Sequence, residues 1–402
     1  MAAGPLCDGP HAGVNEALER IALVDHHVHS IVGGHVDAAA FGGLLSESDR
    51  PAAARAAGWD SQLAYAVRRW CAPLLGLEPH ASQGTYLEHR LSLTNEEAAA
   101  VLLPAAGFEE LLVDTGFRPA ALVDVDTLGR LARTRVRTIV RLETVAEDLV
   151  RSGVEAAGYA DRFRDALAAE MTTSVGCKSV IAYRHGLAFD AAPPSAPEVT
   201  TAAGEWLREI EATGTVRLSH PVLLRFGLWE GARTGRPLQI HTGFGDTDLD
   251  LYRADPALMT DFLRATDTVC PVMLLHTYPF QRSAGYLAQM FGHVYVDVGL
   301  AVNHTGAASD RVIAESLELA PFRKVLFSSD AWGLPELHLL GSWLFRRGLS
   351  RAVGGWVASD EWSLEDAEHV ITRIGHDNAT DVYGPDPLGT RRGSHTPAST
   401  VG

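Results

Sequence analysis

Residues 24–30, VDHHVHS, place three histidines at the end of an apolar run that begins IALV. In an extended strand alternate side chains share a face, so we expect His27 and His29 to project together, with His26 and Val28 on the other side. Two imidazoles on one face can chelate a metal ion, whereas solvated histidines at a polar strand end are the alternative. A metal site would therefore need further ligands from elsewhere in the chain.

Eight short apolar runs alternate with helix-like segments, which is the pattern of repeated strand–helix units. Continuous apolar runs with polar residues at their carboxyl ends are typical of buried parallel strands in barrel enzymes. A doubly wound sheet usually carries a glycine-rich phosphate loop after its first strand, but DHHVHS stands there. We therefore predict an α/β fold, a (β/α)₈ TIM barrel. The runs are ALVDHHVHS, ELLVDTGF, RTIVRLET, TTSVGCKSVIAYR, PLQIHTGF, VMLLHTYP, VYVDVGLAV and VLFSSDAWG.

The length of 402 residues fits one barrel domain spanning residues 1–402. Residues 31–110 contain no convincing strand, and stretches such as NEEAAAVLLPAAG look helical. This insertion leaves the carboxyl end of the first strand, so we expect a mostly helical cap over the active-site mouth; a buttress for the barrel is the alternative. The tail, residues 384–402, is rich in Gly, Pro, Ser and Thr and is predicted to be flexible.

Composition narrows the classes of partner. The formal net charge is -16, from 34 basic and 50 acidic residues, and no run of Lys or Arg suggests nucleic acid or an anionic membrane as a partner. No apolar run is long enough to span a bilayer, and the four cysteines form no C-x-x-C pair. We expect a cytoplasmic protein that acts on a small molecule, with a homodimer as one expected assembly because barrels of this kind often pair.

Further candidate metal ligands stand at the carboxyl ends of other apolar runs. His241 ends LQIH, His276 ends MLLH, and Asp330 ends VLFSSD. A lone histidine after an apolar run is more often a packing residue than a ligand. In a closed ring of parallel strands, however, these side chains share one end with His27 and His29 and can converge on a metal ion.

This set of residues resembles the amidohydrolase superfamily of metal-dependent hydrolases. The H-x-H after the first strand, the histidines after the fifth and sixth, and the Asp after the eighth match in type and order. More narrowly, KSVIAYRHGL, LQIHTGFGDTDLDL, LLHTYPF and SSDAWGLPELHLLG are similar to the branch that includes the amidohydrolase-like half of nodulin/glutamine-synthetase fusion proteins. The resemblance extends from about Ile21 to Tyr383 and is weak in the insertion. The resemblance implies which catalytic residues the chain has more firmly than which substrate it binds, because one fold serves many reactions.

The resemblance also implies how the metal is held. In binuclear members a lysine of the fourth strand, here Lys178, is carboxylated and its carbamate bridges two metals. The alternative is a single metal, with Lys178 as a substrate contact. Zinc is the first expectation, with iron or manganese as alternatives, because the same ligands serve all three. The expected ligands are His27, His29, Lys178, His241, His276 and Asp330.

A metal-activated hydroxide would attack a polarised carbonyl, with Asp330 as the proton acceptor and His276 beside it as a second catalytic residue. We therefore predict hydrolysis of an acyl bond (amide, ester or thioester) in a small carboxylic-acid derivative. A metal-dependent decarboxylase or other lyase and a non-catalytic binding module are the alternatives. Should Asp330 be a pure ligand, His304 could carry the proton. The expected substrate contacts are Arg184, Tyr278, Arg282, His304, Trp332 and His338.

Two further interpretations concern charged residues near the strand ends. Arg141 and Glu143, in RLET, are expected to form a buried ion pair under the site. The acidic GDTDLD stretch lacks the downstream Glu of an EF-hand loop, so we expect it to cap the helix that begins near PALMTDFL.

Overall fold

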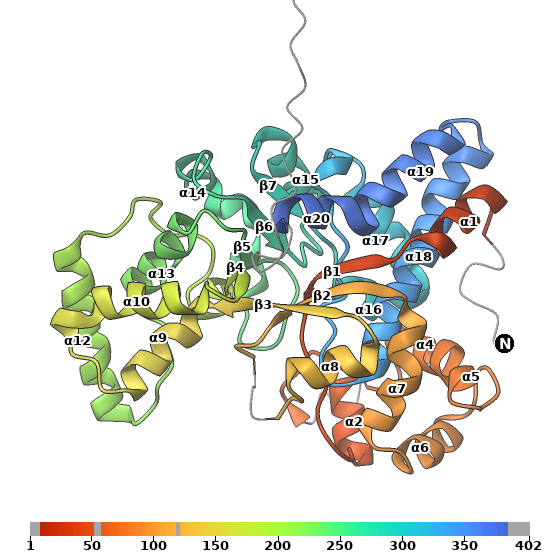
Figure 1. Cartoon of the computed structure of the whole chain (residues 1–402), viewed down its shortest axis with the longest axis horizontal. Coiled ribbons are helices and arrows are strands. Elements are labelled where there is room, and N and C mark those ends of the chain that lie inside the picture. Colours follow the sequence, from red (N-terminus) through yellow and green to blue (C-terminus); the bar gives the residue numbers. More distant parts are fainter. Residues whose placement is uncertain (1–8, 52–57, 118–120, 385–402) are drawn as a thin grey trace, which may run out of the picture.

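The computed structural model describes residues 9–51, 58–117 and 121–384. In this part of the chain, seven parallel strands pair in chain order to form one curled sheet with helices around it (Figure 1). The predicted parallel α/β architecture is therefore confirmed for seven strands. These are β1 (Leu23–Val28), β2 (Phe108–Asp114), β3 (Arg135–Arg141), β4 (Ser174–Ser179), β5 (Leu238–His241), β6 (Val272–Leu275) and β7 (Val294–Val296).

The eighth expected strand is not a regular strand. Residues 325–331 nevertheless lie between the two edge strands, because Leu326 N donates to Val296 O at 2.9 Å and His26 N donates to Phe327 O at 3.3 Å. Backbone pairing with β1 continues where the chain turns polar, because Asp330 N donates to His27 O at 3.1 Å and His29 N donates to Ala331 O at 2.9 Å. The pairing is irregular there, since Ser329 also donates to the carboxylate of Asp25 and Asp330 has a φ of 48°.

The strands are buried on both faces, as their continuous apolar runs predict. Every residue of β1, β4, β5 and β6 is buried. A small core cluster takes residues from most of the strands and from α20 (Asn378–Tyr383). Its members are Val24, Leu112, Ile139, Val175, Met273, Leu275, Leu326, Ala379 and Tyr383.

Most helices follow strands and pack outside the sheet. Helix α12 shows how the sequence sets their limits: Ser195 and Glu198 form a capping box at its start, and Gly214 with a φ of 71° ends it. The described α-helices outside the insertion are α1 (Ala12–Arg20), α8 (Val125–Ala132), α9 (Leu142–Arg151), α10 (Tyr159–Glu170), α11 (Ile181–Arg184), α12 (Ala196–Thr213), α13 (Pro221–Arg233), α14 (Thr260–Ala265), α15 (Gln281–Met290), α16 (Ala301–Thr305), α17 (Ser309–Ser316), α18 (Pro335–Ala358), α19 (Leu364–Thr372) and α20.

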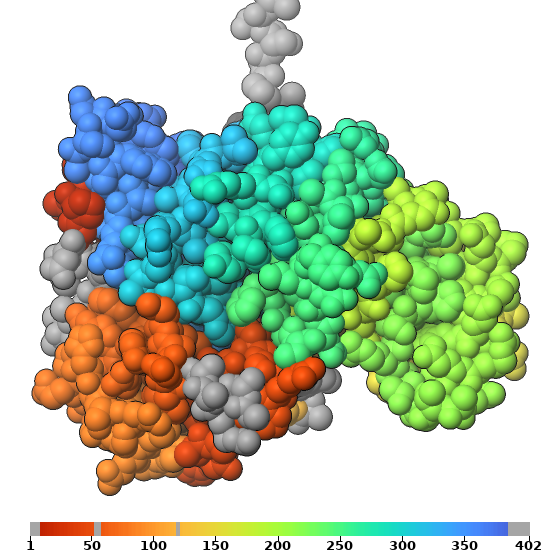
Figure 2. Space-filling model, turned by 180° about the vertical axis from the view of Figure 1, so that it is seen from behind, coloured from red at the N-terminus to blue at the C-terminus, as the bar shows by residue number. Residues whose placement is uncertain are grey.

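Several helices lie between β1 and β2, and they gather in one lobe of the molecule, drawn orange in Figure 2. Apolar side chains of this lobe belong to the same core cluster as those of the sheet. Because β2 begins at Phe108, the insertion ends earlier than the expected residue 110. The helices of its described residues are α2 (Ala38–Leu44), α4 (Gln62–Ala66), the π-helix η1 (Val67–Cys71), α5 (Ala72–Leu74), α6 (Gln83–Leu91) and α7 (Asn95–Ala106).

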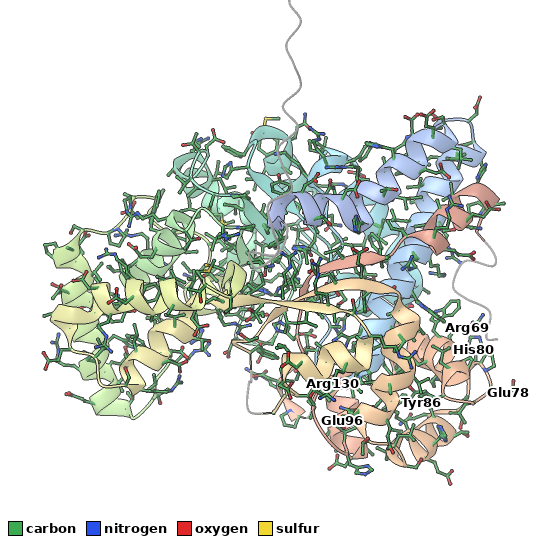
Figure 3. All side chains as sticks on the ribbon, in the orientation of Figure 1. Arg69, Glu78, His80, Tyr86, Glu96 and Arg130 are labelled. Atoms are coloured by element: carbon green, nitrogen blue, oxygen red, sulfur yellow. The ribbon has the colours of Figure 1, made fainter. Side chains whose placement is uncertain are left out.

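A buried charged cluster ties the insertion to the sheet domain. Arg90 of α6 pairs with Glu336 of α18 at 2.6 Å, and neither side chain is exposed to solvent. Tyr86, labelled in Figure 3, donates to the same carboxylate at 3.0 Å. An unpaired charge at this depth would be costly, so the cluster fixes how α6 lies against α18.

Two predictions concern the C-terminal tail and membrane-spanning helices. The tail expected to be flexible lies, apart from Gly384, outside the described residues. Among the described helices, none combines the length and apolar character that crossing a membrane requires.

Candidate active site

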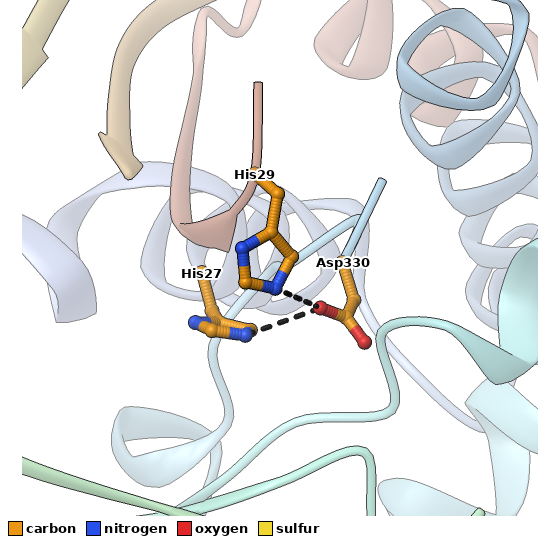
Figure 4. Close-up of side chains that lie close together, drawn as sticks. All are labelled: His27, His29 and Asp330. Atoms are coloured by element: carbon orange, nitrogen blue, oxygen red, sulfur yellow. Dashed lines mark ion pairs between the residues drawn. The ribbon is translucent and has the colours of Figure 1, made fainter. Parts of the chain in front are cut away.

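Three of the expected ligands form a tight group at the carboxyl end of the sheet. Ligand atoms of His27, His29 and Asp330 all lie within 4.8 Å of one another, and all three residues are buried. Nε2 of His27 is 3.1 Å and Nε2 of His29 is 3.5 Å from Oδ1 of Asp330 (Figure 4). Two imidazoles therefore face one carboxylate oxygen, the arrangement of a metal-binding triad.

Hydrogen bonds on the far side of each ring orient the two imidazoles. Nδ1 of His27 lies 2.9 Å from Oε1 of Gln239, whose Nε2 donates to His26 O and to the Tyr383 hydroxyl. Nδ1 of His29 lies 3.2 Å from Asp114 O. Since oxygen acceptors hold the proton on Nδ1, each Nε2 keeps a free lone pair toward Asp330.

His241 and His276 complete a cluster of four imidazoles. The ring centroids of His27 and His276 are 5.1 Å apart, and those of His241 and His276 are 4.8 Å apart. Nε2 of His241 and Nδ1 of His276 are buried without a hydrogen-bond partner, although the latter lies 3.3 Å from Asp330 Oδ2. Burial lowers the pKa of both rings, which keeps them neutral as metal ligands must be.

Lys178 of β4 points into the same cluster. Its Nζ lies 3.0 Å from Nε2 of His27, and the side chain is 2% exposed. Burial lowers the pKa of Lys178 to about 8, although Asp114 and Asp330 favour its charged form. The lowered pKa increases the fraction of this lysine that is the free, nucleophilic amine at neutral pH.

Two ligands occupy strained backbone positions that neighbouring carboxylates stabilise. His276 and Asp330 have φ values of 55° and 48°. Asp297 accepts a hydrogen bond from His276 N at 3.1 Å, and Asp25 accepts from Ser329, next to Asp330. Left-handed residues cost about 1–3 kcal/mol and persist only where the surroundings hold them, so both carboxylates help to place the ligands.

Five of the six expected ligands, all but His27, line a pocket of about 350 Å³, which is large enough for a small metabolite. Guanidinium groups of Arg141, Arg184 and Arg217 line it together with four carboxylates, two from the insertion and two from the loop after β5. Arg217 pairs with one of these carboxylates, that of Asp248, at 2.8 Å. The pocket is lined by His29, Glu47, Asp49, Gly116, Phe117, Arg141, Lys178, Val180, Tyr183, Arg184, Arg217, His241, Asp246, Asp248, His276, Leu300, Asp330 and Trp332.

The insertion contributes directly to this pocket. Glu47 and Asp49, just beyond α2, are among its lining residues. Thr247, in the loop after β5, donates to Asp49, and His304 of α16 lies 3.3 Å from Glu47. The insertion and the strand-end loops therefore meet at the pocket.

Two of the six expected substrate contacts line the pocket, Arg184 and Trp332. Arg282 is instead exposed on α15, where it pairs with Glu315 and Glu318. His338 is buried, and its Nε2 lies 2.9 Å from His29 O, so it supports the backbone of a ligand. Tyr278 packs against the hydrophobic core, and His304 lies beside Glu47 without lining the pocket.

Other expectations need correction. Arg141 pairs with Asp114 at 2.6 Å, whereas Glu143 accepts hydrogen bonds from Ser179 and Val180, so the expected ion pair between Arg141 and Glu143 does not form. Asp255, not the GDTDLD stretch, caps the helical turn that begins at Pro256.

The acidic stretch contributes instead to the pocket, where Asp246 and Asp248 lie on its wall. Sequence reasoning also missed Tyr183, whose ring centroid is 4.3 Å from that of His241. Burial and the charges of Asp246 and Glu47 raise the pKa of Tyr183, so its phenol stays protonated. The only sequence signal for Tyr183 was its place just beyond a strand that carries Lys178.

The donor set fits a divalent metal ion. Neutral imidazoles and a carboxylate are the ligands that zinc, iron and manganese share. The two buried ring nitrogens without hydrogen-bond partners, on His241 and His276, would gain a partner from a bound cation. Orientation of His27 and His29 through their Nδ1 atoms is the support that metal-binding histidines normally have.

Comparison with known proteins agrees with this geometry. The chain is 31% identical over 221 residues to protein fluG of Emericella nidulans, an alignment that covers 52% of this chain and 25% of fluG. The chain therefore spans about a quarter of that relative's length. A crystal structure assigned as a metal-dependent hydrolase, from Lactobacillus casei ATCC 334, has a TM-score of 0.81 at 28% identity and covers 93% of this chain and 98% of its own.

More distant structures share the fold alone. A uronate isomerase of Thermotoga maritima has a TM-score of 0.59 at 12% identity, covering 92% of this chain and 96% of its own. A glucuronate isomerase of Caulobacter crescentus has a TM-score of 0.61 at 14% identity, covering 96% and 95%. The sequence model of the amidohydrolase family matches residues 112–384, well over half of the sequence, and the chain belongs to that family.

Proposed function

We propose that this protein is a metal-dependent hydrolase that cleaves an acyl bond (amide, ester or thioester) in a small carboxylic-acid derivative. One observation carries the proposal: side chains in or just beyond four strands and from residues 325–331 gather around a single pocket. The proposed ligands are His27, His29, Lys178, His241, His276 and Asp330.

A bound divalent metal would supply a water molecule of lowered pKa and would polarise the scissile carbonyl. The chain supplies the proton acceptor. Although burial alone would raise the pKa of Asp330, His276, His27 and His29 hold it well below its usual value, so the carboxylate stays ionised. In this role Asp330 takes the proton from the attacking water and returns it to the leaving group.

Other pocket residues would bind and orient the substrate. Arg184 pairs with Glu147 at 3.2 Å, which holds its guanidinium at the pocket wall, where it can meet a substrate carboxylate. The protonated phenol of Tyr183, next to His241, can donate a hydrogen bond to the carbonyl oxygen of the substrate. These groups support an acid derivative as the substrate class.

We further propose that Lys178 is carboxylated and bridges two metal ions, with zinc as the first choice of metal. Its buried amine lies among imidazoles, where an ammonium beside two dications would be repelled and a carbamate attracted. A single metal with an unmodified lysine is the competing arrangement.

The test is product analysis with the metal-loaded enzyme. Apoprotein prepared with a chelator is reloaded separately with zinc, iron(II), manganese or cobalt and offered a library of small amides, esters and thioesters in ¹⁸O-labelled water. Hydrolysis places one solvent oxygen in the acid product. Asp330→Asn should abolish turnover, and His369→Ala, which removes an exposed histidine on α19, should not.

Two results would contradict the proposal. Release of carbon dioxide without oxygen incorporation would indicate a decarboxylase. Failure of every metal form to turn over any acyl compound, with metal bound, would favour a binding module.

A further inference from the structure

A second pocket, of about 570 Å³, lies where the insertion meets α18, away from the candidate metal ligands. None of the active-site residues lines it. It is bounded by α4 and η1 on one side and by α18 on the other, with Ala307 between them. Its lining residues are Gly9, Gln62, Tyr65, Ala66, Arg68, Arg69, Trp70, His80, Ala307, Leu344, Arg347, Ser350 and Arg351; we call it the basic pocket.

The charge of the basic pocket is unusual for this protein. The chain has a net charge of -16, yet among the residues that the structure describes four arginines, a histidine and no acidic residue line this pocket. Within the described ranges, none of the four arginines makes an ion pair. Asp60, the acid beside Tyr65, accepts a hydrogen bond from that phenol at 3.0 Å, and Asp310 of α17 attracts Arg347 only at longer range.

One arginine has a buried donor that lacks an acceptor. Nε of Arg68 is buried and has no hydrogen-bond partner, while its Nη1 has a long contact of 3.4 Å with Ala81 O. A buried N–H without an acceptor is destabilising, so such groups in native proteins call for an explanation. An anion in the basic pocket would provide one once the guanidinium turns to meet it, since Nε is buried from solvent.

Aromatic rings hold the insertion's arginines in place. The guanidinium of Arg69 lies over the ring of Trp70 at 4.3 Å, and that of Arg68 lies over Tyr65 at 5.0 Å. Stacking of this kind restrains the long side chains before any ligand arrives and lowers the entropic cost of binding.

The backbone around these arginines is also irregular. Residues 67–71 form a π-helix, a feature that occurs often at functional sites. His80 has a φ of 63°, and its backbone N–H donates to Arg68 O at 2.9 Å. Figure 3 shows Arg69 and His80 together at the outer edge of the insertion. This geometry brings a histidine from a separate loop to the arginines of η1.

We propose that the basic pocket binds a small polyanion, with several phosphate or carboxylate groups, between Arg68 and Arg69 of the insertion and Arg347 and Arg351 of α18. Planar guanidinium groups bind both kinds of oxyanion through paired hydrogen bonds. Several negative groups are expected because one anion of single charge would leave most of the four cations uncompensated. The ligand would join the insertion to α18.

The experiment is isothermal titration calorimetry of the metal-loaded protein with three probes that each carry more than one anionic group: inorganic pyrophosphate, ADP and tricarballylate. At least one probe should bind saturably at one per chain, and its affinity should fall with added salt. Preference for the phosphate probes or for the tricarboxylate identifies the class of ligand. In Arg347→Glu/Arg351→Glu the affinity should fall by about tenfold or more, since charge-assisted hydrogen bonds are lost and repulsion is added.

A matched control separates this site from general charge effects. Arg162→Glu/Arg208→Glu changes the net charge equally at two exposed arginines on α10 and α12, and it should bind the probe as the wild type does. The milder Arg69→Gln/Arg351→Gln, which adds no repulsion, should also weaken binding. Absence of binding by all three probes, or undiminished binding to Arg347→Glu/Arg351→Glu, would overturn the proposal.

Discussion

Gln239→Met should weaken metal binding without altering any ligand. The substitution keeps the length of a fully buried side chain and removes its amide. That amide accepts from His27 Nδ1 at 2.9 Å and donates to His26 O at 2.7 Å and to the Tyr383 hydroxyl at 2.8 Å. The first contact orients a metal ligand, and the other two hold the amide in place.

The magnitudes follow from these three contacts. Removing a partner that orients a metal-binding histidine typically lowers metal affinity by about 10- to 100-fold, which is about 1.4–2.7 kcal/mol. Three buried polar groups also lose a partner, at about 1 kcal/mol each, so the free energy of unfolding of the metal-free protein should fall by about 3 kcal/mol. Chelator competition measures the first quantity, and denaturant unfolding of the apoprotein measures the second.

Two further variants isolate the orienting contact. Gln281→Met replaces a buried glutamine that donates to Glu315 on the outer side of the fold, so it should lose stability and keep metal affinity. Tyr383→Phe removes one partner of Gln239 and leaves the bond to His27. If Gln239→Met binds metal as tightly as the wild type while losing stability, the assigned role of Gln239 is wrong.

Three other changes test separate parts of the structure. Lys178→Ala should hold at most one tightly bound metal, and bicarbonate during reconstitution should raise the metal content of the wild type only, because a carbamate is needed for the second ion. Arg184→Gln should raise KM more than it lowers kcat, whereas Arg282→Gln should change neither, because only Arg184 lines the pocket. Arg90→Leu should lower the free energy of unfolding by about 3–5 kcal/mol, because it leaves Glu336 buried and unpaired.

Each of these has its own contrary result. Equal metal content in the wild type and Lys178→Ala would exclude the bridge. A raised KM in Arg282→Gln would mean that α15 contacts the substrate after all. Arg20→Leu breaks an exposed pair with Glu368 and should lower the free energy of unfolding by less than about 1 kcal/mol. If Arg90→Leu lowered it by no more than Arg20→Leu does, burial would not strengthen the Arg90 pair.

The strand-end residues could be predicted because parallel topology alone determines where they gather. Once the runs are taken as parallel strands, His241 and His276 must end at the same edge as His27, whatever the loops do. The eighth run does not form a regular strand because its polar residues also bond side chains such as Asp25, although its backbone still pairs with that of β1. The sequence shows an apolar run, but it does not show that side-chain hydrogen bonds compete with backbone pairing there.

The pocket wall was harder to predict, since it depends on how loops and the insertion pack. Glu47 reaches the pocket from the insertion, and nothing in its neighbourhood of the sequence marks it. Arg282 follows His276 by only six residues, yet α15 carries it to the outer surface. Arg141 was assigned to the wrong carboxylate because the partner on the adjacent strand, Asp114, is distant in sequence.

Elemental analysis of the purified protein tests the central claim most directly. The wild type and the exposed-histidine control His369→Ala should each contain one or two divalent metal ions per chain. His27→Ala and His241→Ala should lose metal and activity together, since each removes a buried donor from a convergent site. Full metal content in both site variants, or none in the wild type after reconstitution, would contradict a metal centre at this end of the sheet.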